Sequence, residues 1–237
     1  STPVERIVVE GGEVRGVDAD GFIPADIVIS NNGVKETVAL AGRHNFPDDY
    51  LSMVDSLRLS FGAVSVKYAL DAEIVKAPLA CYFPDFRDPE LVERQAAIFV
   101  PVPSIAVPSL APPGCQLVLA GSLAPPGLEE PEQAKAVCNE MLDRIENTMQ
   151  DLYPGIEDHV IWKIRTDTRY IAEISGRLTG EVIGVAQNRH QVGNKRPSSA
   201  TPVRGLYLVG ADAGGRGVGT EMAVDSALNL WRLLRNE

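Results

Sequence analysis

Gly205-Leu-Tyr-Leu-Val-Gly-Ala-Asp-Ala-Gly-Gly-Arg-Gly-Val-Gly-Thr220 is the stretch that decides the fold of this chain. It opens with the apolar run Leu206 to Val209 and continues with five glycines among the ten residues from Gly210 to Gly219. The next apolar positions recur at helical spacing: Met222, Ala223, Ser226, Ala227, Leu230, Leu233 and Leu234. The pattern predicts a strand, a glycine loop and a helix, in that order. Such a loop exposes backbone N–H groups at the positive end of a helix, where an oxygen-rich or anionic ligand can approach.

The glycine spacing differs from the dinucleotide-binding fingerprint. That fingerprint is G-x-G-x-x-G inside a βαβ unit, with an acidic residue about 20 positions later. The order Gly215-Arg-Gly-Val-Gly-Thr220 has no glycine at the last position. A tight strand-to-helix turn that binds no ligand therefore stays open as an alternative.

Composition limits the partners that this chain can have. Its 237 residues are 45% hydrophobic, which suits one sizeable core or two modest domains. A formal net charge of −10, with 22 basic against 32 acidic residues, argues against a nucleic-acid partner. Cys81, Cys115 and Cys138 are far apart and odd in number. We therefore expect buried, unpaired thiols in a reducing compartment, the cytoplasm.

Several other classes of site and segment lack their sequence signature. No run reaches the 18 or so uncharged apolar residues of a membrane-spanning helix, so no transmembrane segment is expected, while peripheral contact with a membrane stays open. His44, His159 and His190 show no metal-ligand spacing, so no metal is predicted. A G-x-S-x-G nucleophile elbow is also absent from the sequence.

Apolar periodicity predicts the remaining elements. Residues 4–30 resemble a small β-meander that ends in a buried strand at Ala25–Ser30, and a short helix follows over 35–42. Residues 57–71 alternate as a half-buried strand. Pro131 to Leu152 follows the spacing of an amphipathic helix, and a further strand follows at 159–165. The expected fold class is mixed α/β (α+β).

Three further stretches, taken together with the glycine loop, resemble one enzyme family. They are Ala25-Asp-Ile-Val-Ile-Ser-Asn-Asn32, Leu59-Ser-Phe-Gly-Ala-Val-Ser-Val-Lys-Tyr-Ala-Leu-Asp71 and Gly184-Val-Ala-Gln-Asn-Arg-His-Gln-Val-Gly-Asn-Lys-Arg-Pro197. Their order and spacing resemble the C-terminal half of FAD-dependent oxidoreductases of the phytoene desaturase and amine oxidase type. The family's N-terminal glycine fingerprint is absent. The resemblance therefore implies a fragment that needs the N-terminal half of the same protein as its partner.

The same resemblance assigns domains and site residues. It implies returning pieces of a Rossmann-like FAD domain at 1–34 and 181–237, without the N-terminal βαβ unit, around a substrate domain at 35–180. FAD would be contacted by residues of the glycine loop, while a second group would line the substrate cavity. The first set is Gly210, Asp212, Gly217, Val218, Gly219 and Thr220, and the second is Gln187, Gln191 and Arg196. No catalytic residue is identified.

Function follows from the resemblance as an expectation. The intact protein would be an FAD-dependent oxidoreductase, a desaturase, saturase or isomerase acting on an apolar polyene or isoprenoid-like substrate, while this chain alone would be inactive. The loop after Gly210 contains no aromatic residue, and this favours the desaturase branch over amine oxidases, which enclose their substrates between aromatic rings. Two alternatives stay open, a flavin amine oxidase fragment and a non-catalytic α+β domain that binds a ligand or partner.

Overall fold

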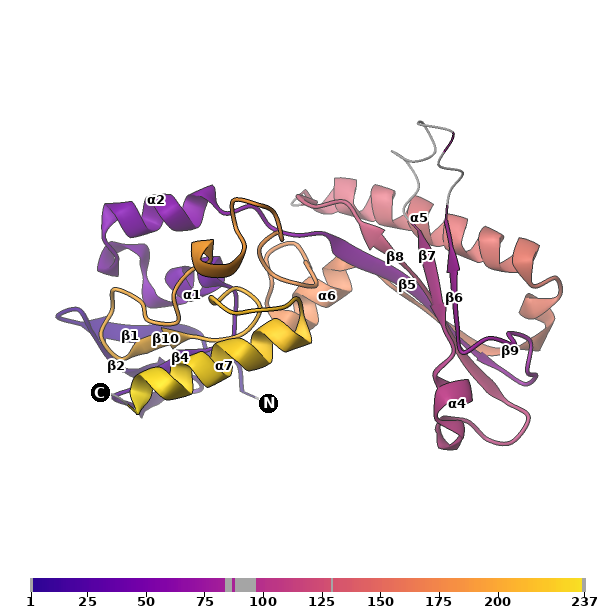
Figure 1. Cartoon of the computed structure of the whole chain (residues 1–237), viewed down its shortest axis with the longest axis horizontal. Coiled ribbons are helices and arrows are strands. Elements are labelled where there is room, and N and C mark those ends of the chain that lie inside the picture. The colour runs from indigo at the N-terminus through magenta and orange to yellow at the C-terminus, as the bar shows by residue number, and fades with distance from the viewer. Residues whose placement is uncertain (1, 84–86, 88–96, 129, 236–237) are drawn as a thin grey trace. The chain divides into compact units, whose positions relative to one another are not determined.

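The chain folds into two compact units. The computed structural model describes residues 2–83, 87, 97–128 and 130–235 (Figure 1). Ser1–Ser60 together with Ser175–Glu237 form the first unit, and Phe61–Ile174 form the second. The chain therefore passes from one unit to the other after Ser60 and after Ile174. The prediction from the sequence had instead assigned residues 35–60 to the substrate domain. Both units combine sheet and helix, which confirms the mixed α/β class.

An antiparallel meander opens the first unit. It consists of β1 (Arg6–Glu10), β2 (Glu13–Asp18) and β3 (Phe22–Pro24). Gly11 and Gly12 turn the first hairpin with φ of +60° and +80°, backbone angles that glycine adopts without a steric penalty. The meander predicted from the sequence is confirmed.

A two-stranded parallel sheet brings together segments far apart in sequence. β4 (Val28–Ser30) pairs with β10 (Leu206–Leu208), so that Ile29 lies opposite Tyr207 (Figure 1). β4 is shorter than the strand predicted at 25–30. This pairing places the glycine loop, which follows β10, beside the segment that follows β4.

Helices pack the core of the first unit. The main ones are α1 (Val34–Ala41), α2 (Asp48–Ser56) and α7 (Thr220–Leu234), of which α1 and α7 were predicted. Two short 3-10 turns are η1 (Arg43–Asn45) and η4 (Gly193–Lys195). The core joins side chains from α1, α2, the meander and β10, among them Ile7, Val14, Val34, Val38, Val54, Leu206 and Leu208. α7 buries Met222, Ser226 and Leu230 outside this cluster.

The second unit is a five-stranded antiparallel sheet in the order β6-β7-β8-β5-β9. The strands are β5 (Gly62–Leu70), β6 (Leu79–Tyr82), β7 (Ile98–Pro101), β8 (Gln116–Ala124) and β9 (Val160–Thr166). Its helices and 3-10 turns are α4 (Pro103–Ala106), η2 (Pro108–Leu110), α5 (Pro131–Leu152), η3 (Ile156–His159) and α6 (Thr168–Ser175). α5 has the bounds that the sequence predicted, and it lies across one face of the sheet (Figure 1).

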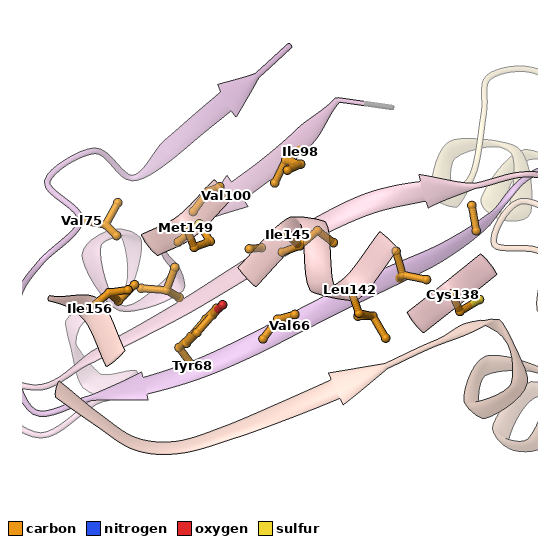
Figure 2. Close-up of a cluster of buried hydrophobic side chains, with 14 of the residues drawn as sticks. Val66, Tyr68, Val75, Ile98, Val100, Cys138, Leu142, Ile145, Met149 and Ile156 are labelled. Atoms are coloured by element: carbon orange, nitrogen blue, oxygen red, sulfur yellow. The ribbon is translucent and has the colours of Figure 1, made fainter. Parts of the chain in front are cut away.

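A buried cluster fills the space between α5 and this sheet (Figure 2). β5 contributes every second residue, including Val66 and Tyr68, while α5 contributes Leu142, Ile145 and Met149 at helical spacing. Each fully buried side chain of this size stabilises the fold by about 1.5–3 kcal/mol. The cluster explains why the period-2 and period-3.6 patterns were readable in the sequence.

Two further predictions from the sequence concern the cysteine thiols and membrane-spanning helices. Cys138 is buried, but Cys115 is half-buried and Cys81 is exposed, so the expectation of three buried thiols is wrong for Cys81; all three thiols are free. Among the described residues, no helix has both the length and the apolar character needed to cross a membrane.

Candidate functional site

The glycine loop leaves β10 through a buried, tightly packed turn. Gly210 has φ of +99°, and a Cβ atom there would collide with Oδ1 of Asn31, just after β4. Its N–H donates to Oγ of Ser226 in α7 at 2.8 Å. Glycine is required at this position for its backbone conformation, and an added side chain would also displace the side chain of Asn31.

Side chains of α7 hold the middle of the loop. Oδ2 of Asp225 accepts the backbone N–H of Arg216 at 2.8 Å and the side-chain amide of Asn229 at 3.1 Å. At Gly217, where φ is +87°, a Cβ atom would meet Cβ of Glu221 at 2.7 Å. The loop therefore bends back over the start of its own helix.

The N-terminus of α7 is open. Its N-cap, Gly219, has φ of 61° and ψ of −121°, supplies no capping side chain, and has no atom within 4 Å of the place where a Cβ would stand. Within the described part of the chain, no acceptor is bound by the N–H groups from Val218 to Met222. Val218 is 50% exposed, and Thr220 is exposed as well. This end of the loop can donate hydrogen bonds to a ligand that carries oxygen or nitrogen acceptors.

Asp212 lies at the opposite, buried end of the loop. Only 2% exposed, it accepts the backbone N–H of Val34 at 3.0 Å through Oδ2 and that of Val185 at 2.7 Å through Oδ1. Nη1 of Arg177 lies 3.2 Å from Oδ2. Both oxygens thus have protein partners, and they join the loop to α1 and to the 175–185 segment. The predicted contact of Asp212 with FAD stays a prediction.

A buried ionic cluster surrounds Asp212. Arg177 also contacts Glu181 at 3.4 Å, and Glu181 accepts the hydroxyl of Thr179 at 3.1 Å. Nearby, Glu36 in the first turn of α1 accepts the backbone N–H of Leu178 at 2.9 Å. Burial raises the pKa of Glu36, despite backbone hydrogen bonds that act in the opposite direction. Two carboxylates, those of Asp212 and Glu181, thus share Arg177 in this cluster.

The three predicted cavity residues have different environments. Gln187 lies beside the start of α7, with its amide 3.7 Å from Sδ of Met222. Gln191, only 6% exposed, accepts the N–H of Arg58 at 3.0 Å and donates to the carbonyl of the same residue at 3.0 Å. Arg196, 5% exposed, donates to the carbonyl oxygens of Ala211 and Val185. Burial lowers the pKa of Arg196.

These contacts commit Gln191 to the backbone of Arg58 and Arg196 to the backbone of Ala211 and Val185, whereas Gln187 approaches the open end of the loop. Of the predicted cofactor residues, Gly217, Val218, Gly219 and Thr220 lie together at that open end. Gly210 and Asp212 instead anchor the loop at its base. A role of any of the nine residues toward cofactor or substrate stays a prediction.

Sequence reasoning missed Glu36, Arg177 and Glu181. Glu36 had only a weak signal, its place as an acidic residue in the first turn of α1. Arg177 and Glu181 had none. They belong to an irregular segment whose charges meet Asp212 only in the tertiary structure.

Comparison with known proteins places the fold. No family model and no curated protein matches the sequence. The structure is similar to an oxidoreductase from Methanosarcina mazei, with 22% identity and a TM-score of 0.67 over 98% of this chain and 49% of that one. A triple mutant of putrescine oxidase, made to redesign cofactor binding, gives 16% identity and a TM-score of 0.60 over 100% and 49%. A Pyrococcus furiosus protein gives 20% and 0.55 over 98% and 46%.

At this level of identity the likeness shows the fold. The chain has the fold of about half of an oxidoreductase of this kind, and it spans about half the length of the solved structures it matches. That result agrees with the resemblance to FAD-dependent oxidoreductases at the level of fold, and the assignment to their C-terminal half stays a prediction.

Proposed function

We propose that this chain is the part of an FAD-dependent oxidoreductase that contacts the ring end of the flavin. The open N-terminus of α7 is the observation that carries the proposal. There the N–H groups of Val218, Gly219 and Thr220 bind no acceptor in the described part of the chain, and open space lies in front of Gly219. Donors in this position stabilise negative charge that develops on a reduced flavin ring.

The charge at this end of α7 favours a ring edge over a phosphate. Glu221 is an exposed carboxylate in the first turn of the helix, so it offsets part of the positive helix end. A dianionic group would meet that carboxylate, whereas a neutral ring with carbonyl and imine acceptors would still receive the N–H donors. FAD, bound through its ring here and through its pyrophosphate by the other half of the protein, fits this distribution of charge.

For the substrate we propose an apolar polyene or isoprenoid-like molecule, reached from the side of Gln187. Two observations bear on the choice. The glycine loop lacks aromatic side chains, which favours the desaturase type. The likeness to putrescine oxidase, with a TM-score of 0.60, favours an amine oxidase as the second candidate.

Absorbance of the intact gene product tests the proposal. We expect a flavin spectrum, bleached anaerobically by a polyene or isoprenoid and not by simple primary amines. A colourless product would contradict FAD binding, and bleaching by amines alone would select the second candidate. Titration of FAD into the present chain should leave the flavin fluorescence unquenched, because the pyrophosphate partner is missing. A sub-micromolar affinity would contradict the division of the site between two halves.

A further inference from the structure

The five-stranded sheet of the second unit has one face that α5 does not cover. Strand alternation and register assign to this face the residues between those of the buried cluster. Its apolar members include Leu79, Phe99, Leu119, Leu123, Trp162 and Ile164. Phe99, Leu123, Trp162 and Ile164 are 40–50% exposed, and Leu79 is 56% exposed. We call this surface the open sheet face.

Lys67 is the one charged residue among the strand residues of the open sheet face. Register places it directly between Leu119 of β8 and Ile164 of β9, and Ser65 and Ala69 are its neighbours along β5. Directly opposite Cβ atoms in an antiparallel sheet are about 4.5–5.5 Å apart, so the stem of Lys67 lies between two apolar side chains. A cationic group is therefore set within apolar surroundings.

No described residue compensates the charge of Lys67. The five strands contain three basic residues, Lys67, Lys163 and Arg165, and no acidic one. Lys163 and Arg165 face α5, where Glu146 contacts them at 3.2 Å and 2.7 Å. Among the residues that the structure describes, no carboxylate pairs with Lys67. This is unusual in a chain with a net charge of −10.

The next acidic residue along the chain from Lys67 is already paired, whereas hydroxyl groups lie beside Lys67. Asp71 lies four positions after Lys67, about 13 Å away along an extended strand. Its carboxylate is already paired with His159 at 2.8 Å. On the other side, the hydroxyls of Ser65 and Thr166 lie 2.9 Å apart, beside Lys67 on the same face. An anion at Lys67 would find hydroxyl groups next to the ammonium.

We propose that the open sheet face binds an amphipathic monocarboxylate, with its carboxylate paired to Lys67 and its hydrocarbon body on the apolar side chains. From β5 to β6 the face extends over three strand spacings, about 14 Å, which accommodates an extended chain. The choice of occupant rests on charge complementarity, since a purely apolar ligand would leave the ammonium desolvated and unpaired. The inference deepens the proposed function by giving its apolar substrate an acidic end group, although the binding itself needs no flavin.

Fluorescence of Trp162 can test this on the full chain. Trp162 and Trp231 are the only tryptophans, so Trp231→Phe leaves a single reporter on the open sheet face. We expect all-trans-retinoate to quench Trp162 saturably and to bind more tightly than retinol, its neutral analogue. Lys67→Met should weaken retinoate about tenfold, equivalent to about 1.4 kcal/mol, and leave retinol within about twofold. Lys135→Met, which removes an exposed lysine from α5, is the matched control and should change neither.

A second variant tests the apolar part of the open sheet face as well as the charge of Lys67. Ile164→Asp places a carboxylate beside Lys67 and should weaken both ligands, with circular dichroism showing an unchanged fold. Equal retinoate affinity in the Lys67 and Lys135 variants would overturn the proposal. So would a stable dimer in light scattering that shields Trp162 and excludes retinoate, because the occupant would then be a second copy. A colourless intact product that still binds retinoate through Lys67 would reject the flavin function alone.

Discussion

Oδ2 of Asp212 accepts the backbone N–H of Val34 at 3.0 Å, although 178 residues separate the two in the chain. Val34 is the first residue of α1, and its N-cap Gly33 supplies no side-chain hydrogen bond. A carboxylate at the start of a helix satisfies an orphan donor and interacts favourably with the helix dipole. The glycine loop thus completes a helix built from the other end of the sequence.

Replacing Asp212 should destabilise the first unit strongly. Asp212→Ala leaves two buried N–H groups without their acceptor and removes one of the two carboxylate partners of Arg177, so we expect a loss of about 3–5 kcal/mol in the free energy of unfolding. Asp212→Asn retains one acceptor oxygen and should lose less, about 2 kcal/mol. Urea denaturation of both variants measures this order. Equal stability of wild type and the alanine variant would contradict the anchoring role.

Glu36 should make stability depend on pH. Because its pKa is raised in the folded state, chiefly by burial, its stabilising contribution is complete below the unfolded pKa of about 4.3 and is lost as pH rises through the folded pKa. Glu36→Gln does not titrate and can still accept the N–H of Leu178. The advantage of this variant over wild type should therefore grow from about pH 4.3 upward.

Urea denaturation at a series of pH values follows that difference. If the advantage of Glu36→Gln shrinks toward neutral pH, the assignment of a raised pKa is wrong.

Tyr68 carries a buried hydroxyl that finds no hydrogen-bond partner among the described residues. Tyr68→Phe removes an unsatisfied polar group, so we expect unchanged stability or a gain of up to about 1 kcal/mol. Tyr82→Phe is the matched control, since the hydroxyl of Tyr82 lies 2.5 Å from that of Tyr153. That variant should lose about 1 kcal/mol. Thermal or urea unfolding that reversed the two effects would contradict the assignment.

Asp225 should protect the glycine loop from proteolysis. Its Oδ2 holds the N–H of Arg216, and the residues on either side of Arg216 are glycines. Asp225→Ala should release this segment without unfolding α7, and trypsin should then cut after Arg216 several-fold faster. Mass spectrometry of the early fragments identifies the site. Cleavage at an unchanged rate would mean that other contacts hold the loop.

Two substitutions of Gly219 in the intact gene product distinguish an effect of backbone strain from an effect on ligand contact. Its φ of 61° penalises any side chain, so Gly219→Ala and Gly219→Asp should lose similar stability, about 1–3 kcal/mol. Only the aspartate adds negative charge in the open space before α7, and only it should lower the flavin content further. Flavin absorbance per protein, measured beside circular dichroism, tests this. Equal flavin content in both variants would favour a turn without a ligand role.

Local patterns were sufficient to predict the elements with strong periodicity. The apolar positions at helical spacing predicted both ends of α5. The alternation of apolar residues along β5 predicted which of its faces is buried. α2, β6, β7 and α6 were not predicted. Their segments are short, and in β6 and β7 apolar residues occupy both faces, so neither period stands out.

By itself the sequence determined the order of strand, glycine loop and α7, because glycine spacing and helical periodicity depend on residues close together in the chain. It also determined the mixed α/β class. Only the tertiary structure decided that Asp212 is an internal anchor, that Gln191 and Arg196 bind backbone groups, and that Lys67 lies on an apolar face where no described carboxylate pairs with it. Hydrogen bonding, burial and charge compensation depend on which distant segments come into contact. Local sequence patterns do not predict those contacts.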